Sequence, residues 1–175
     1  MIIKILNGIG ITIVILIVAA GVLFYLAMRQ YDKQDSGVLV NNVIADTIPF
    51  TYSPSGHMLI SVRIEGSKKS YPFILDSGAS SFIFLHHSNE FDLEENGVAL
   101  GMGGNGGFMI NHFKNIDSIQ IGRFKFHDIN AKETDFTFSC FDDIYGIIGK
   151  EVMRHLTWQI DFENQTIIVV SDPDL

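Results

Sequence analysis

The pattern of apolar and polar positions divides the chain into two parts. From Ile5 to Met28 there are 24 consecutive residues without a charge, whereas apolar and polar positions are mixed in the remainder. A helix of that length would be about 36 Å long, which is enough to cross a hydrocarbon layer about 30 Å thick. The run predicts a transmembrane helix or signal anchor over residues 5–28, preceded by a tail over residues 1–4.

A cleavable signal peptide is the alternative for this segment. Its apolar region would span about 7–15 residues and end in a small-x-small site, whereas here the run is longer and ends in residues 25–28, Tyr-Leu-Ala-Met. We therefore expect the segment to be retained. Lys4 and the terminal amine nearly balance Arg29 and Lys33, so charge does not decide the orientation. The very short tail favours a single-pass anchor with the following domain on the extracytoplasmic side.

Residues 29–45 are expected to form a juxtamembrane linker with a short strand at residues 38–40, and residues 46–172 a folded domain. The segment His57–Ile64 alternates as a half-buried strand does, and a turn at residues 65–68 joins it to a second strand, Ser70–Leu75. Further strands are expected at Ser81–Leu85, Phe108–Ile110, Ile116–Ile121, Phe124–Ile129, Thr157–Phe162 and Thr166–Val170.

One segment, Lys150–Leu156, has the pattern of a short helix. Many short strands and one C-terminal helix predict a mainly β fold, either a small barrel or a sandwich. The chain has 12 Lys and Arg against 20 Asp and Glu, a net charge of −8, which argues against a nucleic-acid partner. Its single cysteine, Cys140, excludes an internal disulfide and a cysteine-based metal cluster.

The strongest chemical signal is the turn Asp76-Ser77-Gly78-Ala79 between two apolar segments. Glycine permits close backbone approach, and the serine hydroxyl is able to fix the loop by hydrogen bonds. If Asp76 met a second copy of itself, the two carboxylates would share a proton and would be able to activate a water molecule. The alternative is an ordinary Asx-type turn in a β protein.

The same tripeptide occurs at residues 35–37, Asp-Ser-Gly. Its flanks are polar and no apolar strand leads into it, so we expect no chemical role there. It also lies too close to Asp76 for a duplicated lobe, with its own set of strands, to fit between the two copies. The chain therefore offers one credible Asp-Ser-Gly loop where the chemistry requires two carboxylates.

The order of the motifs resembles the retropepsin-like aspartic proteases. An apolar strand leads into Asp76-Ser-Gly-Ala, an apolar strand and a glycine-rich hairpin follow, and Gly146-Ile-Ile-Gly149 comes 70 positions after Asp76 with a short helix behind it. The closing segment 160–169 is similar to the terminal hairpin of cellular members of the family. The resemblance covers residues 44–170 and implies a small closed β-barrel of the retropepsin type.

The resemblance also implies roles for individual residues. Asp76 would be the catalytic aspartate, Ser77 the hydroxyl that braces two paired loops, and Gly78 the glycine that lets them approach. The catalytic loop, which includes Ala79, would be supported by Gly146, Ile147, Ile148 and Gly149. A flap would close over an extended peptide substrate through residues 101–109, including Gly103, Gly104, Gly106, Gly107 and Phe108. Ser77 stands where many members have Thr, and Lys150 where viral members usually have Arg.

Other motifs carry less weight. The segment 101–106 matches a dinucleotide fingerprint, but the residues after it indicate a strand, where such a site needs a helix. The histidines, including His86 and His87, lack metal-ligand spacing, and we expect them at the surface or in turns. Cys140 has aromatic neighbours and is interpreted as a buried apolar group. We therefore expect no metal and no cofactor.

Together these observations predict a membrane-anchored aspartic endopeptidase that acts on peptide or protein substrates as a homodimer, each chain supplying one Asp76. The alternative is a membrane-tethered binding module that keeps the fold without the chemistry. The intact tripeptide speaks against this alternative, because a buried carboxylate is costly unless it is paired or hydrogen-bonded.

Overall fold

A computed structural model describes residues 2–33, 37–102, 108–134 and 143–171. The chain separates into two compact units, residues 1–34 and residues 35–175. The first unit contains the helix α1 (Ile2–Lys33), and the second contains the strands and two short helices.

Helix α1 presents apolar side chains to its surroundings. Its side chains are described from residue 10 to residue 26, where Ile11, Ile17 and Phe24 are 62%, 65% and 68% exposed. The helix continues past the uncharged run to Lys33. Within the part of the chain that the structure describes, no helix combines the length and the apolar character that a membrane span requires.

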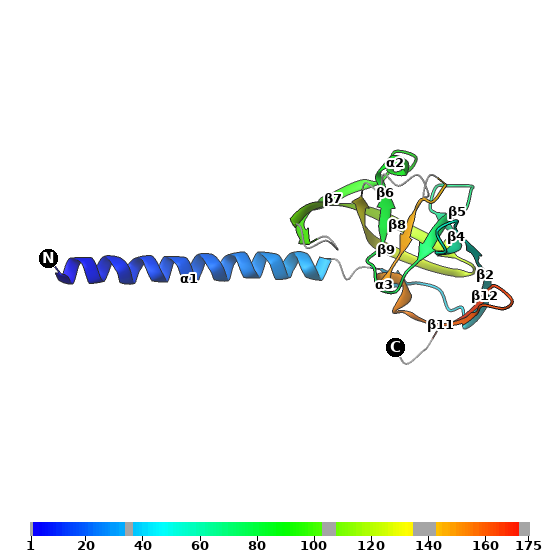
Figure 1. Cartoon of the computed structure of the whole chain (residues 1–175), viewed down its shortest axis with the longest axis horizontal. Helices are drawn as coiled ribbons and strands as arrows, with labels where there is room; N and C mark the ends of the chain where they lie inside the picture. Colours follow the sequence, from blue (N-terminus) through cyan, green and yellow to red (C-terminus); the bar gives the residue numbers. More distant parts are fainter. Residues whose placement is uncertain (1, 34–36, 103–107, 135–142, 172–175) are drawn as a thin grey trace. The chain divides into compact units, whose positions relative to one another are not determined.

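Six strands of the second unit form a closed ring, counting the described residues (Figure 1). In ring order they are β4 (Met58–Ile64), β5 (Tyr71–Leu75), β10 (Gly146–Ile148), β6 (Phe82–Phe84), β9 (Phe124–Thr134) and β8 (Phe108–Ile121). The β5–β10 and β6–β9 pairs are parallel and the others antiparallel. The expectation of a mainly β fold is confirmed, and the ring decides for a barrel over a sandwich.

The remaining elements extend this ring. Three of them pair with it: β1 (Val38–Leu39) with β9, β3 (Thr51–Tyr52) with β4, and β7 (Glu94–Met102) with β8. A separate three-stranded sheet has the order β11 (Leu156–Asp161), β12 (Thr166–Ser171), β2 (Ala45–Pro49). Helix α2 (Leu85–Ser88) follows β6, and helix α3 (Lys150–Met153) follows β10. Figure 1 shows α2 and the three-stranded sheet at opposite ends of this unit.

The barrel interior follows from the alternating pattern of its strands. In β4, Ile60, Val62 and Ile64 are at most 2% exposed, while Ser61 and Arg63 between them face solvent. Burying each such side chain contributes about 1.5–3 kcal/mol. The apolar positions of β8, β9 and β12 fill the same core, with Phe124, Phe126 and Ile167 fully buried. A smaller cluster of Ile74, Phe84 and Ile144 lies beside β5.

Several boundaries differ from those predicted. The segments Phe108–Ile110 and Ile116–Ile121 are parts of one strand, because the polar residues between them continue the pairing with β9. The predicted helix ends at Met153, since Leu156 already pairs with Ser171 in the sheet. Helix α2 and the strands β2, β3, β7 and β10 were not predicted, whereas the short strand near Val38 is present as β1.

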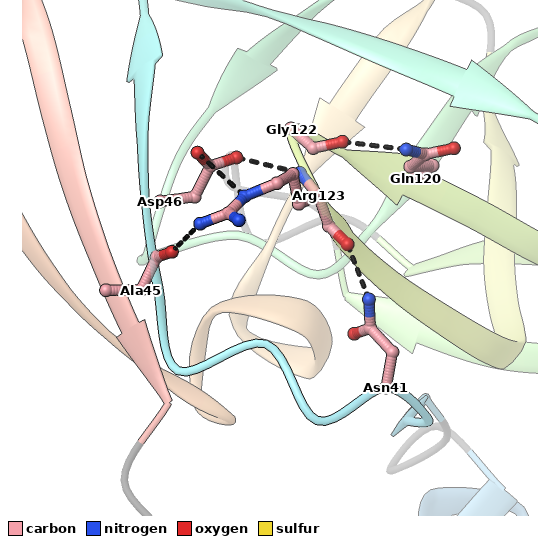
Figure 2. Close-up of polar contacts among 6 residues, drawn as sticks. All are labelled: Asn41, Ala45, Asp46, Gln120, Gly122 and Arg123. Carbon is pink, nitrogen blue, oxygen red and sulfur yellow. Dashed lines mark hydrogen bonds and ion pairs between the residues drawn. The ribbon is translucent and has the colours of Figure 1, made fainter.

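Residues 41–46, near the start of the second unit, form hydrogen bonds with the β8–β9 turn (Figure 2). A carboxylate oxygen of Asp46 accepts a hydrogen bond of 2.8 Å from the Arg123 backbone N–H, and its other oxygen lies 3.3 Å from the Arg123 Nε. The Arg123 guanidinium also donates to the Ala45 carbonyl, and the Asn41 amide donates to the Arg123 carbonyl. Gly122 has a φ of +55°, and a Cβ there would meet Asp46, so this turn requires glycine.

We expect Asp46→Ala to lower the free energy of unfolding by about 1–2 kcal/mol, because it leaves the Arg123 N–H and guanidinium without this acceptor. Thermal unfolding of residues 35–175 would show a loss of a few degrees. Asp92→Ala, at an exposed position, is the matched control and should stay within about 0.5 kcal/mol of wild type. Equal stability of the two variants would contradict a fastening role for Asp46.

Candidate active site

Asp76 stands at the end of a buried strand. Phe73, Ile74 and Leu75 of β5 are at most 7% exposed, and Asp76 follows them directly. Strand β10 runs parallel to β5 with Ile148 opposite Leu75, and the Asp76 N–H donates a hydrogen bond of 3.0 Å to the Ile148 carbonyl. The position of Asp76 is therefore set by the β5–β10 pairing.

The backbone reverses immediately after Asp76. The Gly78 N–H donates to the Asp76 Oδ1 at 2.8 Å, and the Ala79 N–H donates to the Asp76 carbonyl at 3.2 Å. Asp76, Ser77 and Gly78 are exposed, and Ala79 is half-buried. The turn thus has the Asx geometry of the bland alternative, and it also presents a carboxylate at the surface of the domain. Such a carboxylate is free to meet a second one from outside the chain.

Gly149 lies against the backbone of the same loop. A Cβ built on Gly149 would stand 2.4 Å from the Ala79 carbonyl oxygen and 2.4 Å from the Ser80 carbonyl carbon. The Lys150 N–H donates to that Ala79 oxygen at 2.9 Å. Only a residue without a side chain permits this approach. The structure therefore brings together the Asp76–Ala79 turn and the Gly146–Gly149 segment, which the family resemblance had linked.

The opposite side of the loop contacts two charged side chains that sequence reasoning missed. Glu151, in α3, is 1% exposed and accepts a hydrogen bond of 2.8 Å from the Ser81 N–H. Lys132, in β9, is half-buried and donates to the Ser80 Oγ at 3.3 Å. Burial lowers the pKa of Lys132, and the nearby Glu151 carboxylate partly opposes that shift. No local sequence signal distinguishes Glu151 from a solvated glutamate at the start of a helix.

The predicted flap corresponds to the β7–β8 hairpin. Val98 lies opposite His112, and the pairing continues to Met102 opposite Phe108. On one face Ala99, Asn111 and Phe113 are buried, while Val98 and Ile110 are exposed. Of the predicted flap residues, Phe108 begins β8, and Gly103, Gly104, Gly106 and Gly107 lie outside the described residues. Because a strand follows the glycines, the dinucleotide fingerprint lacks the helix that it needs.

The remaining sequence motifs are the histidines, the single cysteine and the second Asp-Ser-Gly tripeptide. His87 is buried, contrary to the expected surface position, because its ring stacks on Tyr145 at 3.8 Å and its Nδ1 lies 2.8 Å from the Glu90 carboxylate. Among the described residues, no group of three His, Cys, Asp or Glu could hold a metal ion. Cys140 and the pair Asp35-Ser36 lie outside the described residues.

A cavity of about 780 Å³ is lined by the β4–β5 turn, the loop after α2 and the middle of β8. It opens beside Tyr71 at the start of β5, whereas Asp76 follows the end of that strand. This cavity is therefore not part of the site around Asp76.

Comparison with known proteins identifies the family. A model of the aspartyl protease family matches residues 60–152, which is more than half of the chain and includes Asp76, the hairpin and Gly149. The chain belongs to the aspartyl protease family. The prediction of an aspartic peptidase is thereby confirmed at the level of the family.

Among solved structures, this aspartyl protease is similar to a retropepsin-like aspartic protease from Rickettsia conorii. The sequence identity is 14% and the TM-score is 0.46, over 77% of this chain and 93% of the other. No curated protein matches the chain. Membership rests on the family match. The roles of Asp76, Ser77, Gly78 and the other site residues stay predictions, because neither comparison assigns individual residues.

We expect Gly149→Ala to lower the free energy of unfolding by about 3 kcal/mol or more, because its Cβ would overlap the Ala79 and Ser80 backbone. Gly78→Ala is the comparison. Its Cβ would stand 3.3 Å from the Asp76 Oδ1, so it should cost about 1 kcal/mol or less while displacing the carboxylate. Chemical denaturation of both variants measures the difference. A Gly149→Ala variant as stable as wild type would show that the loop does not need this contact.

Proposed function

We propose that this protein is a retropepsin-like aspartic endopeptidase that acts as a homodimer, with Asp76 of each chain forming one catalytic dyad. The observation that carries the proposal is the exposed Asp76 carboxylate, held by the β5–β10 pairing at the end of a buried strand, within the segment that matches the family. The closed ring of short strands and the β7–β8 hairpin support it.

Two carboxylates a few ångströms apart share one proton, because both cannot carry a negative charge at that distance. The ionised member removes a proton from a water molecule, and the protonated member donates to the carbonyl oxygen of the scissile peptide bond. Water adds directly to the carbonyl, so no covalent intermediate with the enzyme forms. The resulting gem-diol collapses as the peptide C–N bond breaks, and the departing amine takes the proton that the general base removed from water. The peptide lies extended and pairs its backbone with the β7–β8 hairpins, while alternate side chains enter pockets.

Dimerisation follows from the number of carboxylates that this chemistry requires. The described part of the chain contains one Asp-Ser-Gly turn at the end of a buried strand. A second chain therefore supplies the second carboxylate. A twofold arrangement lets the same surface serve on both copies.

We expect Asp76→Asn to lower kcat/KM for a peptide library by at least roughly 1,000-fold, because the amide cannot act as the general base. Asp92→Asn, at an exposed position, is the control and should leave kcat/KM unchanged. The measurement is cleavage of the library followed by mass spectrometry. Undiminished activity of Asp76→Asn would refute the assignment of the site.

The dimer is tested by mixing wild-type chains with Asp76→Asn chains at constant total concentration. If both copies are needed, only wild-type pairs are active, and an equal mixture that has exchanged subunits retains about one quarter of the activity. A chain that works alone would retain about one half. A domain that stays monomeric at millimolar concentration and cleaves no peptide would favour the non-catalytic binding module instead.

We further propose that residues 5–28 anchor the protein in a membrane, with the protease domain on the extracytoplasmic side. The proposal rests on the uncharged run, which extends on both sides of the described α1 side chains, and on the exposure of the apolar residues among them. Confinement to a bilayer would raise the effective concentration of one chain for another and so favour the dimer.

We expect the full chain to float with phospholipid vesicles in a density gradient at high salt. Val14→Lys combined with Val18→Lys should abolish flotation, because each lysine in the centre of a span costs about 2.5–3.5 kcal/mol. Thr47→Lys combined with Thr157→Lys makes the same change in charge at exposed positions of the domain and is the control. Flotation of both double variants would contradict the anchor.

The side of the membrane on which the domain lies is tested by cysteine labelling. Gln159→Cys, in a Cys140→Ser chain, should react with a membrane-impermeant thiol reagent in intact cells. An unlabelled chain would contradict the extracytoplasmic side.

A further inference from the structure

A buried carboxylate holds the far end of the catalytic loop. Glu151 is 1% exposed, and its Oε2 accepts hydrogen bonds from the Ser81 N–H at 2.8 Å and from the Ser81 hydroxyl at 3.2 Å. Burying a carboxylate costs free energy unless it is hydrogen-bonded. The two hydrogen bonds from Ser81 therefore make the burial of Glu151 possible. Ser81 is also 2% exposed, so its N–H and hydroxyl have little access to water if Glu151 is removed.

Ser81 is the last residue of the loop before β6, and it is held from two further sides. Its carbonyl accepts a hydrogen bond of 3.0 Å from the Lys132 N–H of β9, and its hydroxyl accepts one of 3.3 Å from the Gly149 N–H. Glu151 therefore does not bind an isolated residue. It completes a junction at which β6, β9 and the start of α3 meet.

The same short segment of chain holds both ends of the loop. The Ile148 carbonyl accepts from the Asp76 N–H, and the Lys150 N–H donates to the Ala79 carbonyl. The carboxylate of Glu151, the next residue, accepts a hydrogen bond from the Ser81 N–H. The loop from Asp76 to Ser81 is thus attached to residues 148–151 at its beginning, middle and end. Only the four residues 77–80 separate Ser81 from Asp76, so the position of Ser81 limits where the Asp76 carboxylate can lie.

A positive side chain accompanies this junction. Lys132 donates to the Ser80 Oγ at 3.3 Å, and the Glu151 carboxylate counteracts the effect of burial on its pKa. Replacing Glu151 by a neutral residue would therefore remove both the acceptor for Ser81 and the charge that favours protonated Lys132. Glutamate suits this position better than an apolar residue of similar size, although the surroundings are buried.

We propose that Glu151 is a positioning residue for Asp76: its buried carboxylate fixes Ser81, and through the loop it sets the orientation in which Asp76 meets the second carboxylate. The inference rests on the proposed function. Misplacement of a reacting group by about 1 Å costs roughly 100-fold in rate. Loss of this attachment should therefore lower kcat with little effect on KM, because the hairpin and the substrate pockets are unchanged.

The test compares Glu151→Leu with Glu151→Gln. Leucine removes the acceptor, and we expect kcat to fall by roughly 100-fold with KM changed less than about threefold. Glutamine keeps an acceptor oxygen without the charge, and it should restore kcat to within roughly tenfold of wild type. Kinetics are measured at a temperature at which circular dichroism shows each variant to be folded. A folded Glu151→Leu variant with wild-type kcat would overturn the proposal.

The chain offers a matched control in Glu65, an exposed glutamate that accepts a hydrogen bond from the hydroxyl of Ser118. This pair lies at the β4–β5 turn, at the other end of β5 from Asp76. Glu65→Leu removes the same kind of hydrogen bond and should leave kcat and KM unchanged. An equal fall in kcat for Glu65→Leu would show that the effect is general loss of stability.

If Glu151→Leu does not fold, Ser81→Ala takes its place. It removes the hydroxyl and leaves the backbone hydrogen bond, so kcat should fall by roughly tenfold at constant KM; an unchanged kcat would again overturn the proposal. The Asp76→Asn variant distinguishes a failure of the positioning role of Glu151 from a failure of the proposed function. An inactive Asp76→Asn with fully active Glu151 and Ser81 variants refutes only the positioning role, whereas an active Asp76→Asn refutes the function itself.

Discussion

The close contact between Gly149 and the backbone of Ala79 and Ser80 is the constraint on which the candidate active site depends. It requires glycine at that position, a parallel β10 beside β5, and a chain that turns back directly after Asp76. A contact between two backbone segments permits few alternative arrangements, because no side chain can change rotamer to accommodate a displacement of either segment. Catalysis by carboxylates depends on such fixed placement, because proton transfer falls off steeply once the partners leave hydrogen-bonding geometry.

The loop from Asp76 to Ser81 is fixed to its own domain, but its carboxylate is exposed to solvent. Hydrogen bonds with residues 148–151 hold the loop along its length, whereas Asp76 itself is exposed. This combination suits half of a symmetric site. In the proposed dimer, each chain would position its own carboxylate before association, so ordering of the loop would not be a cost of binding.

The sequence was sufficient for the parts of the fold that local pattern determines. The alternation of β4, the apolar β5 and the turn after Asp76 were all predictable, because each is encoded by neighbouring residues. Strand β2 was missed because Asp46, Thr47 and Pro49 give it no β pattern, and it exists only through pairing with β12. Glu151 was missed for a related reason: its burial is decided by donors on Ser81, 70 positions earlier. The likeness to a family, rather than residue spacing, linked Gly149 to Asp76.

The three-stranded sheet pairs the beginning of the folded domain with its end, Ala45 opposite Val170. During synthesis β2 leaves the ribosome long before β12 exists, and it has no strand of its own sheet to pair with until almost the whole domain has been made. Contacts between such distant residues form late and slow the folding of a chain. The domain therefore cannot complete its architecture on a truncated nascent chain. Formation of this sheet therefore depends on the synthesis of β12, however early the other strands of the domain are made.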